Sequence, residues 1–187
     1  DVCSSDLVDT TISPATVADL GSALTTIPPD MKLHGRVQRI MDERVRMTTG
    51  NVDMDWGFAE NLAYASIIRD GHPVRFSGQD SQRGTFFHRH VVLHDQVTGG
   101  TWTPLENLFE GQPAFRAINS LPPDPAVLDQ QYDFVTCTEV LEHLHWPERE
   151  WATFARLVRP GGWLGLMTRT NNSRPTRALR IIAEAVA

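Results

Sequence analysis

The chain lacks several features that would define its class at once. It has two cysteines, Cys3 and Cys137, which lie far apart, so a disulfide framework is not expected and a reducing, cytoplasmic setting is the default prediction. No apolar run approaches about 20 residues, so no membrane span is expected. The N-terminus shows no basic segment followed by an apolar stretch, so no secretory signal is predicted.

Positive charge is also scarce. Lys and Arg number 17 against 23 Asp and Glu, which gives a formal net charge of −6, so a broad nucleic-acid-binding surface is not expected. Hydrophobic residues make up 41% and charged residues 21%, as is ordinary for a globular protein. The 187 residues suffice for one domain with a sizeable core or for two small domains, and no internal repeat is evident.

Hydrophobic spacing predicts helices and a strand in the first half. A helix over 32–47 is indicated by four apolar positions on one face, namely Val37, Ile40, Met41 and Val45. A second helix over 57–70 has the buried face Phe58, Leu62, Ala65 and Ile68. Alternation over 72–77 predicts a strand, and this helix–strand unit suggests α/β architecture. Residues 10–30 are expected to form a short helix or a loop, 86–93 a helix or strand, and 102–115 mostly loop.

The pattern changes after the proline-rich breaker at 122–125. Strands are predicted over 134–138 and 163–168, the first of them buried. A helix between them is expected to begin near Pro147 and to stop at Pro160-Gly161-Gly162. Residues 178–185 predict a final amphipathic helix, within an otherwise unassigned tail at 169–187.

The first seven residues, DVCSSDL, show no periodicity and no apolar stripe. They resemble the translation of a sequencing adapter, so we predict that residues 1–7 are a non-native leader. The alternative is an ordinary frayed polar terminus.

Four motifs then follow one another: DWGFAENLAY, HPVRFSGQDSQRGTFFHRH, TWTPLENL and EGQPAFRAINS, at 55–64, 72–90, 101–108 and 110–120. With them, residues 35–121 resemble the thiamine-dependent decarboxylating component of the 2-oxoglutarate dehydrogenase complex. The predicted domain runs over 8–121. The resemblance implies oxidative decarboxylation of 2-oxoglutarate in the tricarboxylic acid cycle, with the parent enzyme a homodimer within a multienzyme complex.

The same resemblance implies part of the domain that holds the aminopyrimidine ring of thiamine diphosphate. The domain that binds the diphosphate through magnesium is expected outside this chain. The family's ylid-forming glutamate should follow the FRAINS-like segment, but Asp124 and Pro125 stand there. The site is therefore predicted to be incomplete, and the chain inactive as it stands.

Within the HPVRFSGQDSQRGTFFHRH motif, the resemblance implies that Gln79 and Asp80 bind cofactor and that Arg83, His88 and His90 are catalytic. A dicarboxylate substrate favours cationic donors, and Arg89 adds one more to the cluster. The alternative is a structural loop network or a solvated face.

Two further possibilities attach to this motif. On a strand, His88 and His90 would share a face and could form a metal site with His94, but no cysteine or carboxylate completes it, so no metal is predicted. Glu60, upstream of the motif, could pair with a neighbouring cation, although a solvated helix charge is the favoured interpretation.

The second half carries YDFVTCTEVLEHL at 132–144 and RPGGWLGLMT at 159–168. It resembles class I methyltransferases, which use S-adenosylmethionine, over a domain at 122–168. The resemblance implies that Thr138 and Glu139 bind cofactor at the carboxyl edge of a parallel sheet. No glycine-rich turn precedes them, so Glu139 has an alternative role as a helix-start charge. Cys137 is most simply a core residue.

The combined prediction is an α/β chain in which a partial thiamine-diphosphate-binding pyrimidine domain is joined to a partial Rossmann-like methyltransferase sheet. The join is predicted between Ser120 and Ala126. Three hypotheses follow: an inactive fragment of a 2-oxoglutarate dehydrogenase, an S-adenosylmethionine-dependent methyltransferase, or a non-functional assembly chimera. As a fragment or chimera the chain is expected to bind neither cofactor appreciably, and no nucleic-acid or membrane partner is expected.

Overall fold

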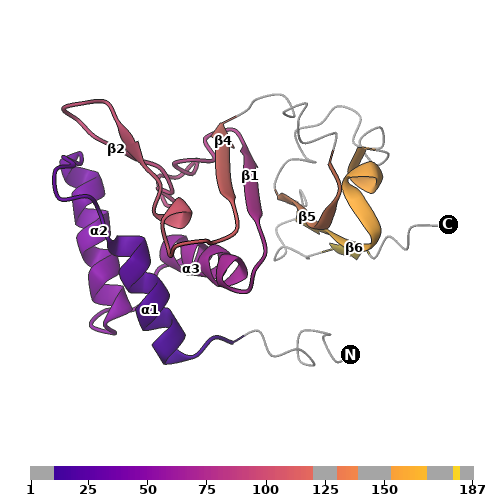
Figure 1. Cartoon of the computed structure of the whole chain (residues 1–187), viewed down its shortest axis with the longest axis horizontal. Helices are drawn as coiled ribbons and strands as arrows, with labels where there is room; N and C mark the ends of the chain where they lie inside the picture. Colours follow the sequence, from indigo (N-terminus) through magenta and orange to yellow (C-terminus); the bar gives the residue numbers. More distant parts are fainter. Residues whose placement is uncertain (1–10, 120–129, 139–152, 168–178, 182–187) are drawn as a thin grey trace, which may run out of the picture. The chain divides into compact units, whose positions relative to one another are not determined.

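The computed structural model describes residues 11–119, 130–138, 153–167 and 179–181, and every structural statement below concerns these ranges (Figure 1). The chain divides into two compact units, Asp1–Leu121 and Pro122–Ala187, and each is described by itself. No helix within the described ranges is long and apolar enough to cross a membrane.

Three helices begin the first unit: α1 (Pro14–Thr25), α2 (Gly35–Thr48) and α3 (Trp56–Arg69). Each has a side chain that caps its amino end. The carboxylate of Asp55, for example, accepts a 2.7 Å hydrogen bond from the backbone N–H of Phe58 and so satisfies a donor that lacks a helical partner. The helices predicted over 32–47 and 57–70 are confirmed. Of the two alternatives for residues 10–30, a short helix or a loop, the short helix is confirmed as α1.

Burial confirms the predicted face of α3 and corrects that of α2. On α3 all four predicted positions are buried: Phe58, Leu62, Ala65 and Ile68. On α2 the buried positions are Met41, Arg44 and Met47, whereas Val45 is 46% exposed. The prediction for Val45 was wrong because the helix is rotated to bury a charged residue, Arg44, whose partners lie far away in the sequence.

The core of the first unit lies among these helices and the adjoining strand. Gly21 of α1 lets the helices approach closely, since a Cβ there would lie 2.5 Å from the hydroxyl oxygen of Thr48 on α2. The buried cluster contains Leu20, Leu24, Met47, Phe58, Leu62, Ala65, Ile68, Val91, Leu105 and Phe115. Burial of this apolar surface is the main stabilising contribution to the unit.

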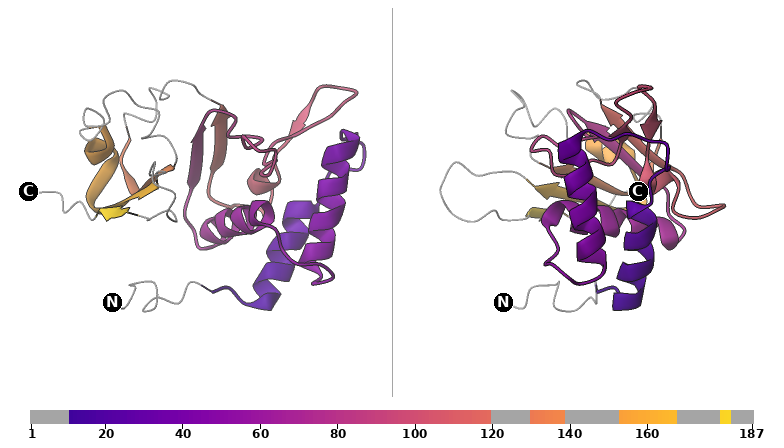
Figure 2. Two further views of the ribbon diagram at one scale, coloured as in Figure 1. Left: turned by 180° about the vertical axis from the view of Figure 1, so that it is seen from behind. Right: turned by 90° about the vertical axis from the view of Figure 1, so that its left-hand side faces the viewer.

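Two strand pairs complete the first unit. β1 (Val74–Gly78) pairs in parallel with β4 (Phe115–Asn119), and α3 lies beside this pair (Figure 2). β2 (Leu93–His94) and β3 (Thr101–Trp102) pair antiparallel, and a 3-10 helix, η2 (Pro104–Glu106), follows. The mixed α/β class is confirmed.

The strand β4 was not predicted, because its partner β1 lies about 40 positions earlier in the chain and its apolar pattern spans only five residues. The segment 86–93 is neither the predicted helix nor a strand as a whole, since only Leu93 belongs to β2. Phe87 and His90 have left-handed backbones, with φ of 57° and 45°. His88 and His90 therefore do not share a strand face, so the condition for the alternative metal site is not met.

The second unit contains β5 (Tyr132–Thr138), a short helix at 153–157, β6 (Val158–Met167) and β7 (Leu179–Ile181). β5 and β6 pair in parallel, and β7 pairs antiparallel with β6. Cys137 is buried with Val158 and Leu164, as expected for a core residue. The predicted strands are confirmed over 134–138 and over 163–167, the described part of the strand predicted at 163–168, although Phe134 is 61% exposed rather than buried.

Two other predictions for this unit were wrong. Pro160-Gly161-Gly162 lies within β6 instead of ending a helix, because pairing with β5 extends the strand backward to Val158. Gly162 permits this approach, since a Cβ there would lie 2.8 Å from the carbonyl oxygen of Asp133. Residues 179–181 of the predicted final helix form β7, whose backbone pairs with β6 from Leu164.

Several predictions fall outside the described residues. They concern the leader at 1–7, the breaker at 122–125 with Asp124 and Pro125, the helix start at Pro147, Glu139, and most of the tail at 169–187.

Candidate functional site

The candidate site is the loop at 78–92, which connects β1 to β2 and carries the HRH sequence. Three non-glycine residues in the described chain have left-handed backbones, and all three lie in this loop: Asp80, Phe87 and His90, with φ of 53°, 57° and 45°. Each such residue costs roughly 1–3 kcal/mol and persists only where its surroundings hold it. The loop must therefore be anchored strongly by the rest of the unit.

Arg44 supplies the first anchor. Its side chain is buried, and its Nη2 donates to the carbonyl oxygens of His88 and Arg89 at 2.9 and 2.8 Å. Burial lowers the pKa of Arg44, while the carboxylates of Asp55 and Glu60 oppose that shift. A guanidinium stays protonated in proteins, so a fixed positive charge holds two consecutive backbone carbonyls.

Two residues of α3 complete this anchor. Asn61 is buried, and its Nδ2 donates to the carbonyl oxygens of Gly57 and Arg89, both at 2.9 Å. Gly57 leaves room for the loop, because a Cβ there would overlap the carbonyl oxygen of His88. The backbone of His88 and Arg89 is thus fixed from two helices.

Glu60 supplies the second anchor. Its Oε2 accepts from Nε of Arg89 and its Oε1 from Nη2 of Arg89, both at 3.0 Å, which is a bidentate pair. Tyr64 also donates its hydroxyl to Oε1 at 2.8 Å, and the Arg89 guanidinium lies 4.2 Å from the ring centroid of Phe76. Burial and Glu60 together raise the pKa of Tyr64. The favoured prediction for Glu60, a solvated helix charge, was wrong.

A third anchor ties the loop to β4. The side-chain amide of Gln82 donates to the carbonyl oxygen of Ala117 at 3.0 Å. Asn119 accepts from the backbone N–H of Gln82 at 3.0 Å and donates to its side-chain oxygen at 3.1 Å. These contacts join the loop to the end of the parallel strand pair.

Among the predicted site residues, Arg83 and Asp80 bind each other. Their ion pair measures 2.9 Å, and the guanidinium lies 4.0 Å from the ring centroid of Phe87. Gln79 is exposed beside them. Since Arg89 is paired with Glu60, both arginines of the expected cationic cluster have carboxylate partners within the unit.

His88 and His90 are held close to these charges. The Nε2 of His88 lies 3.7 Å from Oε2 of Glu60, and its Nδ1 is buried without a hydrogen-bond partner among the described residues. Burial, followed by Arg89, lowers the pKa of His88 from its ordinary value, and Glu60 opposes the shift. Burial, followed by Arg44, lowers the pKa of His90. The lowered pKa values favour the neutral form of both imidazoles, in which each ring has one donor and one acceptor.

A small cavity adjoins the anchors. It is bordered by Arg44, Asn61 and His90, and its volume of about 10 Å³ has room for roughly one water molecule. It cannot take the aminopyrimidine ring of thiamine diphosphate. In the described part of the chain no three His, Cys, Asp or Glu side chains gather in a way that could hold a metal ion. These residues do not by themselves fit thiamine diphosphate with magnesium.

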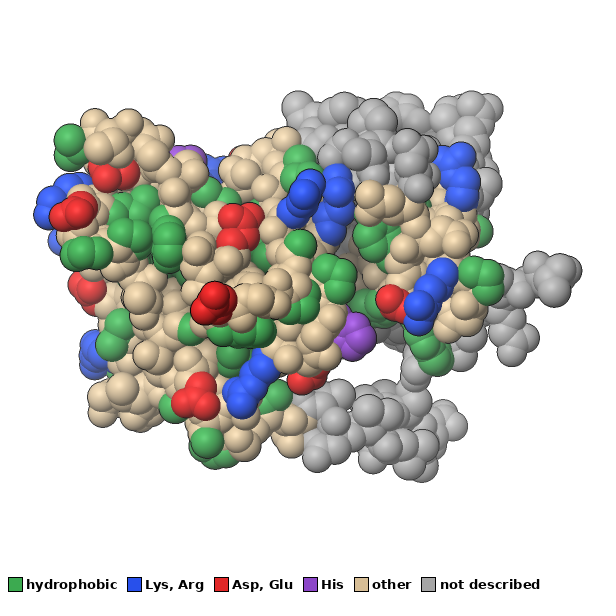
Figure 3. Space-filling view, in the orientation of Figure 1, with side chains coloured by type: hydrophobic (Ala, Val, Ile, Leu, Met, Phe, Trp, Pro, Cys, Tyr) green, Lys and Arg blue, Asp and Glu red, His purple; other side chains and the backbone are tan. Residues whose placement is uncertain are grey.

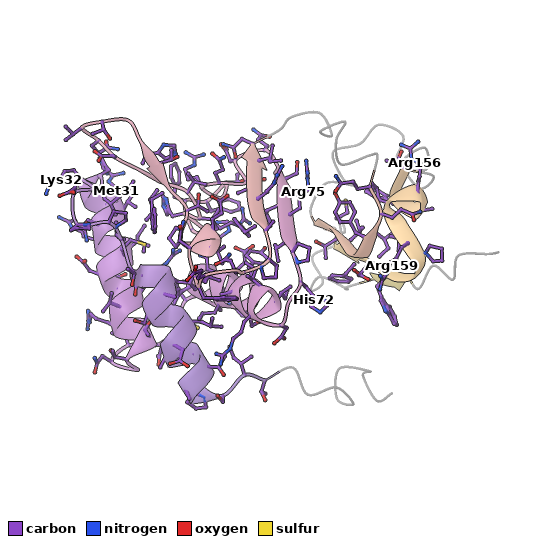
Figure 4. All side chains as sticks on the ribbon, viewed as in Figure 1. Met31, Lys32, His72, Arg75, Arg156 and Arg159 are labelled. Atoms are coloured by element: carbon purple, nitrogen blue, oxygen red, sulfur yellow. The ribbon has the colours of Figure 1, made fainter. Side chains whose placement is uncertain are left out.

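The face of the molecule in Figure 3 shows how charge is distributed over the described residues. Acidic and basic side chains are interspersed there, without a large region of one sign. In Figure 4, Arg75 lies on β1, where its register partner on β4 is Arg116.

In the second unit, Thr138 is the last residue of β5 and pairs with Met167, the last residue of β6. Because the strands are parallel, their carboxyl ends lie at one edge, where ligands bind in such sheets. Arg159, labelled in Figure 4, forms an ion pair with Asp133 at the other end of the two strands. The described residues supply an edge for S-adenosylmethionine but no glycine-rich turn, so they do not fit this cofactor by themselves.

Sequence patterns missed Arg44, Asn61 and Tyr64 as parts of the site. A usable signal existed for the first two, since each is a polar residue at a position that the helical period places on a buried face. A buried polar side chain requires a partner, and the partners here are loop carbonyls.

Comparison with known proteins connects both units to enzymes. The chain is similar to the 2-oxoglutarate dehydrogenase E1 component of Azotobacter vinelandii, with 42% identity over 130 residues, which cover 70% of this chain and 14% of that protein. It is also similar to those of Cupriavidus necator and Brucella ovis, each 34% identical, over 96% and 94% of this chain and 22% and 20% of those proteins. The chain thus spans less than a quarter of the length of these relatives.

The model of the methyltransferase domain family matches residues 55–185. This match begins in the first unit, and the matches to the Cupriavidus and Brucella proteins reach into the second, so both comparisons extend across the boundary at Leu121. This family match covers well over half of the residues of the chain. The chain therefore belongs to the methyltransferase domain family.

Proposed function

We propose that the loop at 78–92 is a substrate-recognition loop of a thiamine-diphosphate-dependent 2-oxoglutarate decarboxylase. The observation that carries this proposal is the strained loop, whose HRH backbone is held by the buried guanidinium of Arg44. Backbone strain that the surrounding structure holds in place is typical of functional sites. The names of the relatives support the same substrate.

Recognition proceeds by hydrogen bonding and by exchange of one ion pair. His90, as a neutral imidazole, donates to one oxygen of the 2-oxo acid, and His88 transfers its Nε2–H hydrogen bond from Glu60 to another oxygen. The pair between Arg83 and Asp80 is 41% and 38% exposed, so it contributes little to stability. A substrate carboxylate can therefore take the place of Asp80 on Arg83. Gln79 lies beside this exchange, where it is proposed to contact the cofactor.

Thiamine diphosphate, when bound to the complete enzyme, supplies the electron sink for decarboxylation. The loop contributes orientation of the substrate, and the remaining walls of the site come from protein outside the described residues. We propose that these walls belong to a homodimer within a multienzyme complex, and that this chain is inactive by itself.

Calorimetric titration of the purified chain tests this proposal. We expect saturable binding of 2-oxoglutarate that is at least tenfold weaker in Arg83→Gln, and no binding of thiamine diphosphate with magnesium. Arg39→Gln, an exposed position on α2, is the matched control and should bind as the unmodified chain does. Binding of 2-oxoglutarate that is unaffected by Arg83→Gln would remove the proposed role of the loop.

Methyl transfer from S-adenosylmethionine is a second candidate function, favoured by the parallel pair β5–β6 and the family match. Thr138 lies at the appropriate edge, and Glu139, the next residue, is proposed to share the cofactor. Micromolar binding of S-adenosylmethionine that Thr138→Ala weakens would support this candidate. Absence of S-adenosylmethionine binding would exclude methyl transfer and leave 2-oxo acid recognition as the one remaining proposal.

We also infer that the two units have separate origins, joined between Ser120 and Ala126. The boundary between the compact units lies in this interval, although both comparisons cross it. Amplification of source DNA across codons 117–127 tests whether the join exists in a gene. A product of the expected length would exclude an assembly artefact.

A further inference from the structure

We propose that Glu60 is a positioning residue for His88, which it directs by fixing Arg89 and by accepting a hydrogen bond from Nε2 of the imidazole. Its role in substrate recognition rests on the function proposed above. The contact between Glu60 and His88 stands independently of that function.

The donors around Glu60 leave one acceptor site available. Among the described residues, Oε1 accepts from both Tyr64 and Nη2 of Arg89, whereas Oε2 accepts only from Nε of Arg89. A carboxylate oxygen can accept two hydrogen bonds. The imidazole Nε2 of His88 lies 3.7 Å from Oε2, so a small movement of the ring closes the remaining bond.

The other nitrogen of His88 favours the same arrangement. Nδ1 is buried, has no hydrogen-bond partner in the described part of the chain and packs against Gly84, where a Cβ would lie 2.7 Å from it. A proton on Nδ1 would therefore be a buried donor without an acceptor, which is unfavourable. A proton on Nε2 meets the carboxylate of Glu60 instead. Both sides of the ring thus favour the Nε2–H tautomer.

The charges that face His88 come from three elements. Arg44 lies on α2, Asp55 and Glu60 belong to α3 and its cap, and Arg89 is the next residue of the loop. Burial is the largest influence and lowers the pKa of His88, as do the two arginines, while the two carboxylates raise it.

The direction of the change in the His88 pKa distinguishes the proposed role of Glu60 from a loss of structure in the loop. Removal of the Glu60 charge should lower the pKa of His88 further, because the arginines then act with less opposition. Unfolding of the loop should raise the pKa toward its ordinary value, because burial is relieved. The two effects have opposite signs.

For the ligand, the consequence is a fixed donor. Because the single proton of the neutral ring lies on Nε2 and faces Glu60, an incoming ligand oxygen must replace Oε2 as the acceptor of that proton, while Arg89 continues to compensate the carboxylate charge. An incoming carboxylate or keto oxygen then meets a donor whose orientation is already determined. Prior orientation of this kind reduces the entropy lost on binding.

The test is a histidine-ring ¹H–¹⁵N correlation spectrum of the full-length chain, with His88 assigned through His88→Gln. We expect the Nε2–H tautomer in the unmodified chain, and a shift of the His88 titration midpoint to lower pH in Glu60→Gln. Asp42→Asn, an exposed acid on α2, is the control and should leave the midpoint unchanged.

An Nδ1–H tautomer would overturn the inference, and so would an unchanged or raised midpoint in folded Glu60→Gln. If Glu60→Gln does not fold, the tautomer of the unmodified chain decides. An unchanged midpoint together with intact 2-oxoglutarate binding would refute this inference alone. The predicted tautomer and shift without 2-oxoglutarate binding would refute the proposed function alone.

Discussion

The Nη2 of Arg44 donates to the carbonyl oxygen of His88 at 2.9 Å, across 44 positions of sequence. This bond links the middle of α2 to the center of the candidate loop. Arg44 also reaches the next carbonyl, that of Arg89, which accepts a further hydrogen bond from Asn61 of α3. Arg44 thus supplies two of the hydrogen bonds that fix the backbone of the HRH segment.

Replacement of Arg44 should destabilise the first unit strongly. Arg44→Met keeps most of the apolar volume but removes the charged donor from two carbonyls, which should lower the free energy of unfolding by about 2–4 kcal/mol. Urea unfolding followed by circular dichroism measures this change. Arg39→Met, at an exposed position of the same helix, should alter it by less than about 0.5 kcal/mol. Equal effects of the two variants would contradict the anchoring role.

Because α3 closely approaches the loop at Gly57, replacement of glycine by alanine should have opposite effects on stability at Gly57 and at Gly35. Gly57→Ala places a methyl group against the carbonyl oxygen of His88, so it should cost roughly 1–3 kcal/mol. Gly35→Ala, at the start of α2, meets no atom within 4 Å and should be neutral or stabilising by up to about 1 kcal/mol. Thermal unfolding distinguishes the signs, and a harmless Gly57→Ala would show that the loop does not lie against α3.

Tyr64 should make stability fall at high pH. Burial and Glu60 raise the pKa of its hydroxyl above the ordinary value near 10, so the unfolded chain loses this proton first. The associated stability is complete below pH 10 and is lost as pH rises toward the folded pKa. Tyr64→Phe should reduce this alkaline loss in urea titrations between pH 8 and about 11, whereas Tyr132→Phe should not. The same alkaline loss in both variants would refute the prediction.

The two histidines of the loop should make stability fall on acidification. Burial lowers the pKa of both His88 and His90 in the folded chain, so the unfolded chain takes up protons first as the pH falls below about 6.5. Stability is therefore present above that pH and lost as pH drops through the folded values. The double variant His88→Gln, His90→Gln should flatten this slope. A matched His94→Gln variant should retain it, and a slope that survives in the double variant would exclude these residues as its source.

Sequence patterns predicted the helices and the loop location but not the interactions that hold the loop. The face of α3 follows from its apolar period, because those residues pack locally within one helix. Arg44 and β4 could not be placed in this way, since their partners lie about 40 positions away and only the folded chain brings them together. Similarly, Pro160-Gly161-Gly162 has the composition of a helix stop, yet pairing with β5 makes it part of a strand. Glu60 was misjudged because its solvated alternative is commoner on helices.

The central claim is that the anchored loop recognises a 2-oxo acid through His88 and His90. Titration of the ¹⁵N-labelled chain with 2-oxoglutarate, observed at the histidine rings and compared with glutarate, tests this most directly. The account predicts saturable shifts of the His88 and His90 signals with 2-oxoglutarate, much weaker shifts with glutarate, and little change at His34 or His94. Ring signals of His88 and His90 that do not respond to 2-oxoglutarate would contradict it.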